Sequence, residues 1–155
     1  MKRILQVFGR LCRDRSGNAM MEFAIGAGVL VAAFTGTFQF GYTFYQYNSL
    51  SNGVNQGARY AAMRVYDSPN STPSQGFLTA VKNMVVYGDP AGGATPILPG
   101  LTTAHVNVVP TFTNNVPTLI TVSINGYQLD AAVKTITFIN KPRASFVYQG
   151  FYSPY

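Results

Sequence analysis

The sequence predicts an α+β protein in which a long N-terminal transmembrane helix continues into a small head built on an antiparallel sheet. An apolar run at residues 20–42 is long enough to cross a bilayer, and apolar residues at helical spacing follow it. Strand-like alternation appears only in the last third of the chain. The 155 residues suffice for one modest globular domain in addition to an anchor.

The distribution of charge indicates membrane topology. Charged residues make up only 10% of the chain, and five of the eleven Lys and Arg residues precede Gly17. Basic residues that flank the first apolar segment hold that flank in the cytoplasm, which predicts an N-in/C-out orientation. The other basic residues are scattered, and no basic patch interleaved with aromatic residues stands out, so we expect no nucleic-acid partner.

Residues 1–17 form a basic leader. The spacing of its few apolar residues fits a short amphipathic helix on the inner membrane face. The alternative is a disordered basic tail, because so short a helix is only marginally stable alone. The leader contains Cys12, the one cysteine of the chain, so no internal disulfide can form.

The apolar run has two interpretations. At 1.5 Å per residue, about 20 helical residues span the hydrocarbon core, so residues 20–42 fit a single transmembrane helix. The alternative is a cleaved signal peptide that ends near Ala33-Phe34-Thr35. Signal-peptide cores are shorter than this run, and Glu22 stands early inside it, so the length favours the anchor.

Small residues recur within the run. Gly28, Ala32 and Gly36 lie four residues apart and therefore share one face, which suits close helix packing in lipid. Alternatively, Gly and Ala are simply frequent in membrane helices. An aromatic belt that marks the outer membrane edge comes next: Phe38, Phe40, Tyr42, Phe44, Tyr45 and Tyr47.

The helix is predicted to continue into the head. One face of the following segment is apolar at i, i+4 spacing, and Pro69 then stops the helix. This predicts one helix over residues 18–66. Its apolar face consists of Leu50, Val54, Ala58, Ala61, Ala62 and Val65.

Residues 67–155 are predicted to form an extracytoplasmic α+β head. Ser74 is a suitable N-cap and Gly88 a suitable stop for a helix over Ser74–Tyr87. After a loop at residues 89–100, the expected strands are Val106–Val109 and Leu119–Asn125, joined by a hairpin connection at Thr111–Pro117, and a last strand at Ala144–Tyr152. Leu129–Ile139 fits either a strand or a short helix.

The segment around Gly17 resembles type IV pilin-like precursors, and most closely the TadE/TadG-like family of tight-adherence pilus proteins. The matching residues are Arg15, Gly17, Glu22, Phe23, Ala24 and Ile25, with Ala58-Arg59-Tyr60-Ala61 further along. The resemblance implies cleavage after Gly17 by a prepilin peptidase, with Asn18 as the new N-terminus. It also implies that Glu22 and Phe23 act in assembly. A proline common in this family is replaced here by Gly26, Ala27 and Gly28.

Glu22 also has a physical rationale. A carboxylate inside a membrane helix costs a few kcal/mol unless it is paired. Cleavage would create an α-amino group at Asn18, and Glu22 of one subunit could neutralise that group on its neighbour, fixing the register of a filament. Alternatively, Glu22 is stabilised by the helix dipole and reaches the membrane interface.

The sequence carries no pattern that indicates an enzyme. His105, the one histidine, is expected in a strand beside Val106, and no nucleophile elbow, phosphate-binding loop or metal-ligand cluster appears. We therefore expect no catalytic residue, metal or cofactor. The favoured reading is a pilin or pseudopilin that partners other pilin-like subunits and passes from the bacterial inner membrane to a surface filament. An unprocessed single-pass scaffold of the pilus machine and a membrane-tethered binding module are the alternatives.

Overall fold

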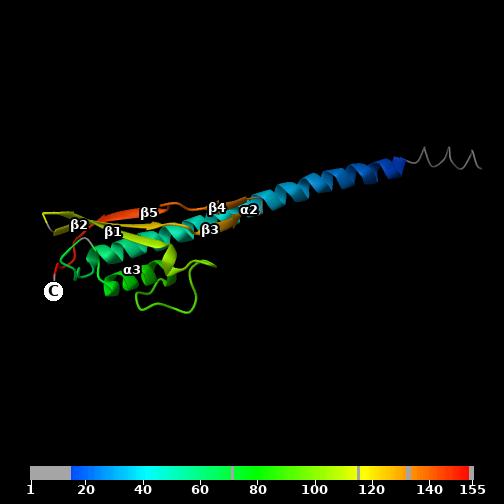
Figure 1. Ribbon diagram of the computed structural model, residues 1–155. Coiled ribbons are helices and arrows are strands. Elements are labelled where there is room, and N and C mark those ends of the chain that lie inside the picture. The colour runs from blue at the N-terminus through cyan, green and yellow to red at the C-terminus, as the bar shows by residue number, and fades with distance from the viewer. Residues whose placement is uncertain (1–14, 71, 115, 132–133, 154–155) are drawn as a thin grey trace, which may run out of the picture. The chain divides into compact units, whose positions relative to one another are not determined.

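The computed structural model describes residues 15–70, 72–114, 116–131 and 134–153 (Figure 1). The chain divides into two compact units, one ending at Gly41 and one beginning at Tyr42. A long N-terminal apolar helix is followed by a small antiparallel sheet, so the predicted α+β class with a pilin-like layout is confirmed.

The first unit, where described, is the N-terminal part of helix α2 (Arg15–Met63). The sequence predicts that the helix begins at Asn18. It begins three residues earlier, at Arg15, and therefore includes Gly17. No proline lies between Arg15 and Met63, and nothing else in the segment interrupts the backbone hydrogen bonds of a helix. Most of the predicted leader, residues 1–14, lies outside the described residues.

Helix α2 ends at Met63, three residues before the predicted end at Tyr66. The backbone N–H of Tyr66 donates to the carbonyl oxygen of Phe151 at 3.1 Å, and Tyr66 pairs with Tyr152 in an isolated β-bridge. Tertiary pairing therefore ends the helix before Pro69 does. As a consequence Val65, predicted on the buried face, is 47% exposed, whereas the other five residues of that face are buried.

Helix α3 (Gln75–Tyr87) confirms the predicted second helix and both of its caps. The Oγ atom of Ser74 accepts a hydrogen bond from the N–H of Phe77 at 3.1 Å. Gly88 has φ 75° and its N–H donates to the carbonyl oxygen of Met84, an end that glycine adopts at no steric cost. The buried face of α3 consists of Phe77, Ala80, Val81, Val85 and Val86.

Two glycines let the C-terminal part of α2 approach α3 closely (Figure 1). A Cβ atom built on Gly57 would lie 2.2 Å from the Cγ2 atom of Val85, and one built on Gly53 would lie 2.9 Å from the Val85 carbonyl oxygen. Such distances are too short for real contacts, so the packing of the two helices requires glycine at both positions.

Replacing Gly57 with alanine is expected to destabilise the head by about 1–3 kcal/mol, because Val85 has no room to yield in the core. The matched control is Gly41→Ala in the same helix, where nothing lies within 4 Å of the added methyl group. That variant should be neutral or slightly stabilising, since alanine favours helix. Thermal unfolding of the full chain in detergent compares them, and equal midpoints for the two variants would contradict the close approach.

The main sheet has three antiparallel strands, β1 (Val106–Thr113), β2 (Val116–Ile124) and β5 (Arg143–Val147), in the order β1-β2-β5. The predicted strands and hairpin are confirmed, but most of the expected connection at Thr111–Pro117 belongs to the strands themselves, and Asn114 takes the left-handed turn conformation with φ 54°. The segment Leu129–Ile139, which from its sequence fits either a strand or a short helix, lies mostly in a hairpin of β3 (Gln128–Ala131) and β4 (Lys134–Thr137).

Two local predictions were wrong. The last strand ends at Val147 and does not continue to Tyr152, because beyond the Leu119–Val147 pair the chain turns and Gln149 donates to the carbonyl oxygen of Ala62 at 2.9 Å. His105 lies in the 3₁₀ helix η1 (Thr103–His105) and not in a strand, because its Nδ1 atom is 3.1 Å from the backbone nitrogen of Thr102 and caps that turn.

Tyr66 lies at the centre of an aromatic cluster that joins the end of α2 to the C-terminal segment. Its ring is fully buried, and ring centroids of neighbours lie 5.3–6.3 Å away. Its hydroxyl donates to the carbonyl oxygen of Asn70 at 2.9 Å, and burial raises its pKa to about 12. The four aromatic rings that surround the Tyr66 ring are those of Phe77, Phe112, Tyr148 and Tyr152.

Candidate membrane anchor and assembly surface

The predicted site residues of the first unit all lie on α2, and their described side chains point to the outside. Glu22 is exposed, and Phe23 is 77% exposed. Gly17 is exposed as well, and Asn18 follows it within the helix, so the predicted cut lies in the first turns of α2. Asn18 and Glu22 are four residues apart, which places them one helical turn from each other.

An open apolar groove of about 420 Å³ follows one face of this part of α2. Two phenylalanines, Phe23 and Phe34, stand toward its two ends, and Gly26 and Ala27 leave room between them. The complete lining is Phe23, Gly26, Ala27, Leu30, Val31 and Phe34. At 100° per residue, the predicted packing residues Gly28, Ala32 and Gly36 lie on roughly the opposite face. The two faces therefore differ: one carries the groove, and the other carries these three small residues.

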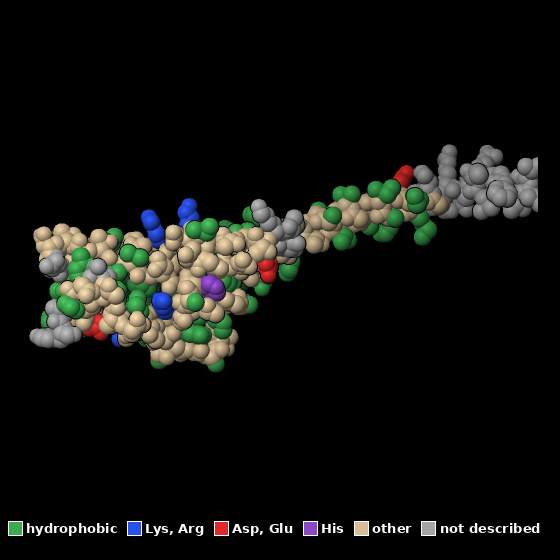
Figure 2. Space-filling view, in the orientation of Figure 1, with side chains coloured by type: hydrophobic (Ala, Val, Ile, Leu, Met, Phe, Trp, Pro, Cys, Tyr) green, Lys and Arg blue, Asp and Glu red, His purple; other side chains and the backbone are tan. Residues whose placement is uncertain are grey.

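Helix α2 contains a segment that is apolar and long enough to cross a membrane, and none of that segment is buried. Figure 2 shows hydrophobic side chains along the helix of the first unit. A long helix with so many exposed apolar side chains suits lipid and not water. The hydroxyl of Thr37 donates to the carbonyl oxygen of Ala33 at 2.9 Å, so this polar group is satisfied within the helix, as the hydrocarbon interior requires.

The predicted aromatic belt is exposed along its whole length, on the last residues of the first unit and the first residues of the second. Exposed Tyr and Phe at the end of an apolar helix are typical of the membrane–water interface.

Chemistry-bearing groups are sparse in the part of the chain that the structure describes. His105 is occupied in the capping contact with Thr102, and no group of three or more His, Cys, Asp or Glu side chains is found among the described residues. A basic pocket at residues 139–143, beside Tyr47 and Ser51, is a feature that the sequence analysis missed. The signal that could have found it is the Lys141-Pro142-Arg143 triplet, two cations around a turn residue.

An apolar helix long enough to cross a membrane, followed by a small antiparallel sheet, gives the described residues a pilin-like layout and suggests a membrane anchor. Residues 17–59 match the family model described as TadE-like protein, which confirms the resemblance read from the sequence over this segment. The match begins at Gly17 and includes Glu22 and Phe23. The similarity over this segment suggests a pilus-associated protein. No curated protein and no solved structure matches the chain.

Proposed function

We propose that this chain is a pilin or pseudopilin subunit. It is inserted in the bacterial inner membrane with its N-terminus in the cytoplasm, is cut after Gly17 by a prepilin peptidase, and enters a surface filament with other pilin-like subunits. The observation that carries the proposal is the unburied apolar part of α2, which begins at the TadE-like motif and leaves both of its faces for lipid or for other helices.

The two faces of α2 support an assembly role. The grooved face is lined by Phe23 and Phe34 among other residues, and the opposite face includes Gly28, Ala32 and Gly36. Bulky side chains of one helix against small residues of another are the usual way in which helices approach closely in an apolar environment. Identical helices that offer both faces can therefore pack against each other repeatedly, as a filament core requires.

Glu22 supplies the register in this proposal. Cleavage after Gly17 leaves a positive α-amino group at Asn18, one turn from Glu22 on the same helix. In a stack of subunits, Glu22 of one chain then meets the α-amino group of the next chain. A pair of this kind, buried between helices, specifies position because any other register leaves a charge unpaired in an apolar core.

The test is to locate the chain in its native host after mechanical shearing. A filament subunit appears in the sheared, pelletable fraction together with other pilins. A scaffold of the pilus machine, the main alternative, stays entirely in the membrane fraction even when filaments are abundant. Recovery of all chains in the membrane fraction of piliated cells would therefore overturn the subunit assignment.

A further inference from the structure

Strand β5 forms one edge of the main sheet, because β2 lies between it and β1 (Figure 1). In an antiparallel pair, the residues of a strand alternate between those that bond to the neighbouring strand and those whose backbone groups point away from it. Tyr148 donates to the carbonyl oxygen of Thr118 at 2.9 Å, and Ile124 donates to that of Pro142 at 3.2 Å. These two bonds fix the alternation. The even-numbered residues of β5 bond to β2, and the odd-numbered residues point their N–H and C=O groups to the open edge.

The outward backbone groups of β5 are unpaired among the described residues. They belong to Arg143, Ser145 and Val147, and no described residue donates a hydrogen bond to them or accepts one from them. All three residues are exposed, and Val147 is 65% exposed. An exposed row of unpaired N–H and C=O groups is a template to which another extended chain can pair.

The other edge of the main sheet, on β1, is protected against such pairing. Asn125 donates to the carbonyl oxygen of His105 at 2.8 Å, and the alternation that follows from this bond places Pro110 at the outer edge of β1. Proline has no N–H group to donate and is typical of strand edges that do not pair further. Strand β5 contains no proline. Of the two edges, the one on β5 therefore suits an added strand.

An open groove of about 330 Å³ lies between the edge of β5 and the C-terminal end of α2. Apolar side chains in it are partly exposed, Met63 at 58% and Phe146 at 37%. A strand paired to β5 would direct alternate side chains over this groove and cover both of them. The complete lining of the groove is Arg59, Ala62, Met63, Ser145, Phe146, Val147 and Gln149.

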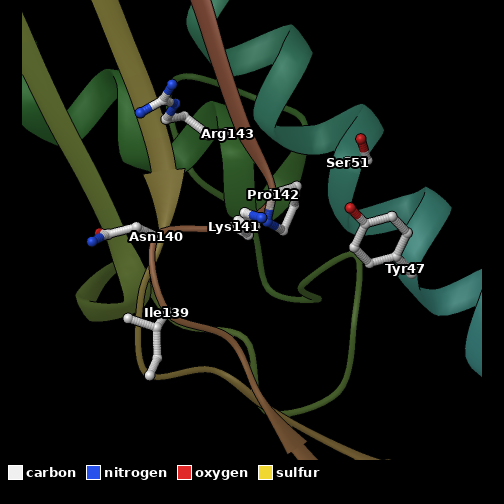
Figure 3. A pocket seen from close by; sticks show the side chains of 7 residues that line it. All are labelled: Tyr47, Ser51, Ile139, Asn140, Lys141, Pro142 and Arg143. Atoms are coloured by element: carbon white, nitrogen blue, oxygen red, sulfur yellow. The ribbon is translucent and has the colours of Figure 1, made fainter.

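The charges beside this edge are positive. Arg59 lines the groove from α2, and Arg143 begins β5. In Figure 3 the side chain of Arg143 points away from Tyr47 and Ser51 of α2, so it lies on the outer face of the sheet. Among the described residues that line the groove, none is acidic. Two copies of this edge in contact would combine their arginines without a carboxylate, so the charge favours a different chain that carries acidic residues.

We propose that the edge of β5 binds an extended strand of another protein chain, in which apolar and acidic side chains alternate. The backbone of that strand pairs with the outward N–H and C=O groups of Arg143, Ser145 and Val147. Its apolar side chains cover Phe146 and Met63 in the groove, and its acidic side chains lie on the outer face near Arg143. The inference uses only contacts within the second unit and depends neither on leader cleavage nor on filament assembly.

The test titrates the full chain in detergent with the peptide acetyl-Thr-Val-Glu-Val-Glu-Val-Thr-amide and follows the amide hydrogen exchange of β5 by NMR. At saturating peptide, exchange of the Ser145 and Val147 N–H groups should slow by at least about tenfold. The N–H groups of Ala144 and Phe146 should slow much less, because they already bond to β2. A peptide with lysine in place of both glutamates should bind at least about tenfold more weakly, since it meets the arginines with like charge.

Two substitutions at Ser145 separate backbone pairing from side-chain contact. Ser145→Pro removes the outward N–H group and no bond to β2, and should weaken binding of the acidic peptide by at least about tenfold. Ser145→Ala is the matched control. Both variants lose the hydroxyl, which lies 2.8 Å from the hydroxyl of Thr121, but the alanine variant keeps the N–H group. It should bind the acidic peptide like the wild type.

Unchanged exchange at Ser145 and Val147 up to the solubility limit of the acidic peptide would overturn the proposal, and this result does not require the proline variant to fold. Equal affinity for the two peptides, or an equal loss in both Ser145 variants, would also overturn it. Protection of the same N–H groups without peptide, rising with chain concentration, would contradict it by showing that a second copy covers the edge. The readout involves no filament, so its failure is distinguishable from failure of the subunit assignment.

Discussion

Replacing Glu22 with alanine is expected to leave membrane insertion intact and to reduce the chain recovered in sheared filaments by more than about 100-fold. Insertion should not suffer, because removing a carboxylate makes the helix more apolar. Assembly should fail because the α-amino group of Asn18 on the neighbouring subunit would be buried without its partner. Quantitative blotting of the membrane and sheared fractions from the same cells measures both effects.

Two further substitutions at Glu22 separate charge from shape. Glu22→Gln keeps the size and polarity of the side chain but removes its charge, so pairing with an ammonium group predicts that it fails as Glu22→Ala does. Glu22→Asp keeps the charge on a shorter side chain and should assemble in part. Normal filaments from the alanine or glutamine variant would remove the pairing argument and leave Glu22 as a residue stabilised by the helix dipole.

Replacing Tyr66 with alanine is expected to destabilise the head by about 3–5 kcal/mol, the range for a fully buried aromatic ring. The ring contacts four other aromatic rings, and the cavity left behind would lie where the end of α2 meets the C-terminal segment. Small domains are stable by only about 5–15 kcal/mol, so this loss should be visible as fast digestion of the head by a protease.

Two control variants separate the contribution of the buried Tyr66 ring to stability from that of its hydroxyl and from that of an exposed ring nearby. Tyr66→Phe keeps the ring and loses only the hydrogen bond to Asn70, which should cost about 1 kcal/mol. Phe151→Ala removes an exposed ring from the same C-terminal segment and should change stability by less than about 0.5 kcal/mol. If Phe151→Ala and Tyr66→Ala had equal effects, the aromatic cluster would not be what holds the C-terminal segment.

The helices could be predicted from the sequence because their signals are local. The apolar run, the i, i+4 face from Leu50 to Ala62, and the caps at Ser74 and Gly88 depend on neighbours within a few residues. The end of α2 was misplaced because Tyr66 pairs with Tyr152, more than 80 residues away in sequence. A pattern search along the chain has no access to such a partner, and tertiary pairing overrides helix propensity at that point.

The C-terminal half was less predictable for the same reason. Whether Leu129–Ile139 forms strands depends on a hairpin between two short segments, and periodicity alone does not separate short strands from a helix. The basic pocket was missed because Tyr47 and Lys141 are distant in sequence and meet only through the fold. The motif around Gly17 and Glu22 could be recognised from the sequence because it is a continuous segment, and it lies within the residues that match the TadE-like family model.

The most direct test of the account is the intact mass and N-terminal sequence of the protein recovered from its native host. Processing after Gly17 predicts a chain that begins at Asn18, with a mass lower by that of residues 1–17. That result would give Glu22 the α-amino partner on which filament assembly depends in this account. A chain that still begins at Met1 would contradict the account and favour an unprocessed membrane scaffold. A chain that begins near Gly36 would contradict it differently, by showing that the apolar run is a removed signal peptide.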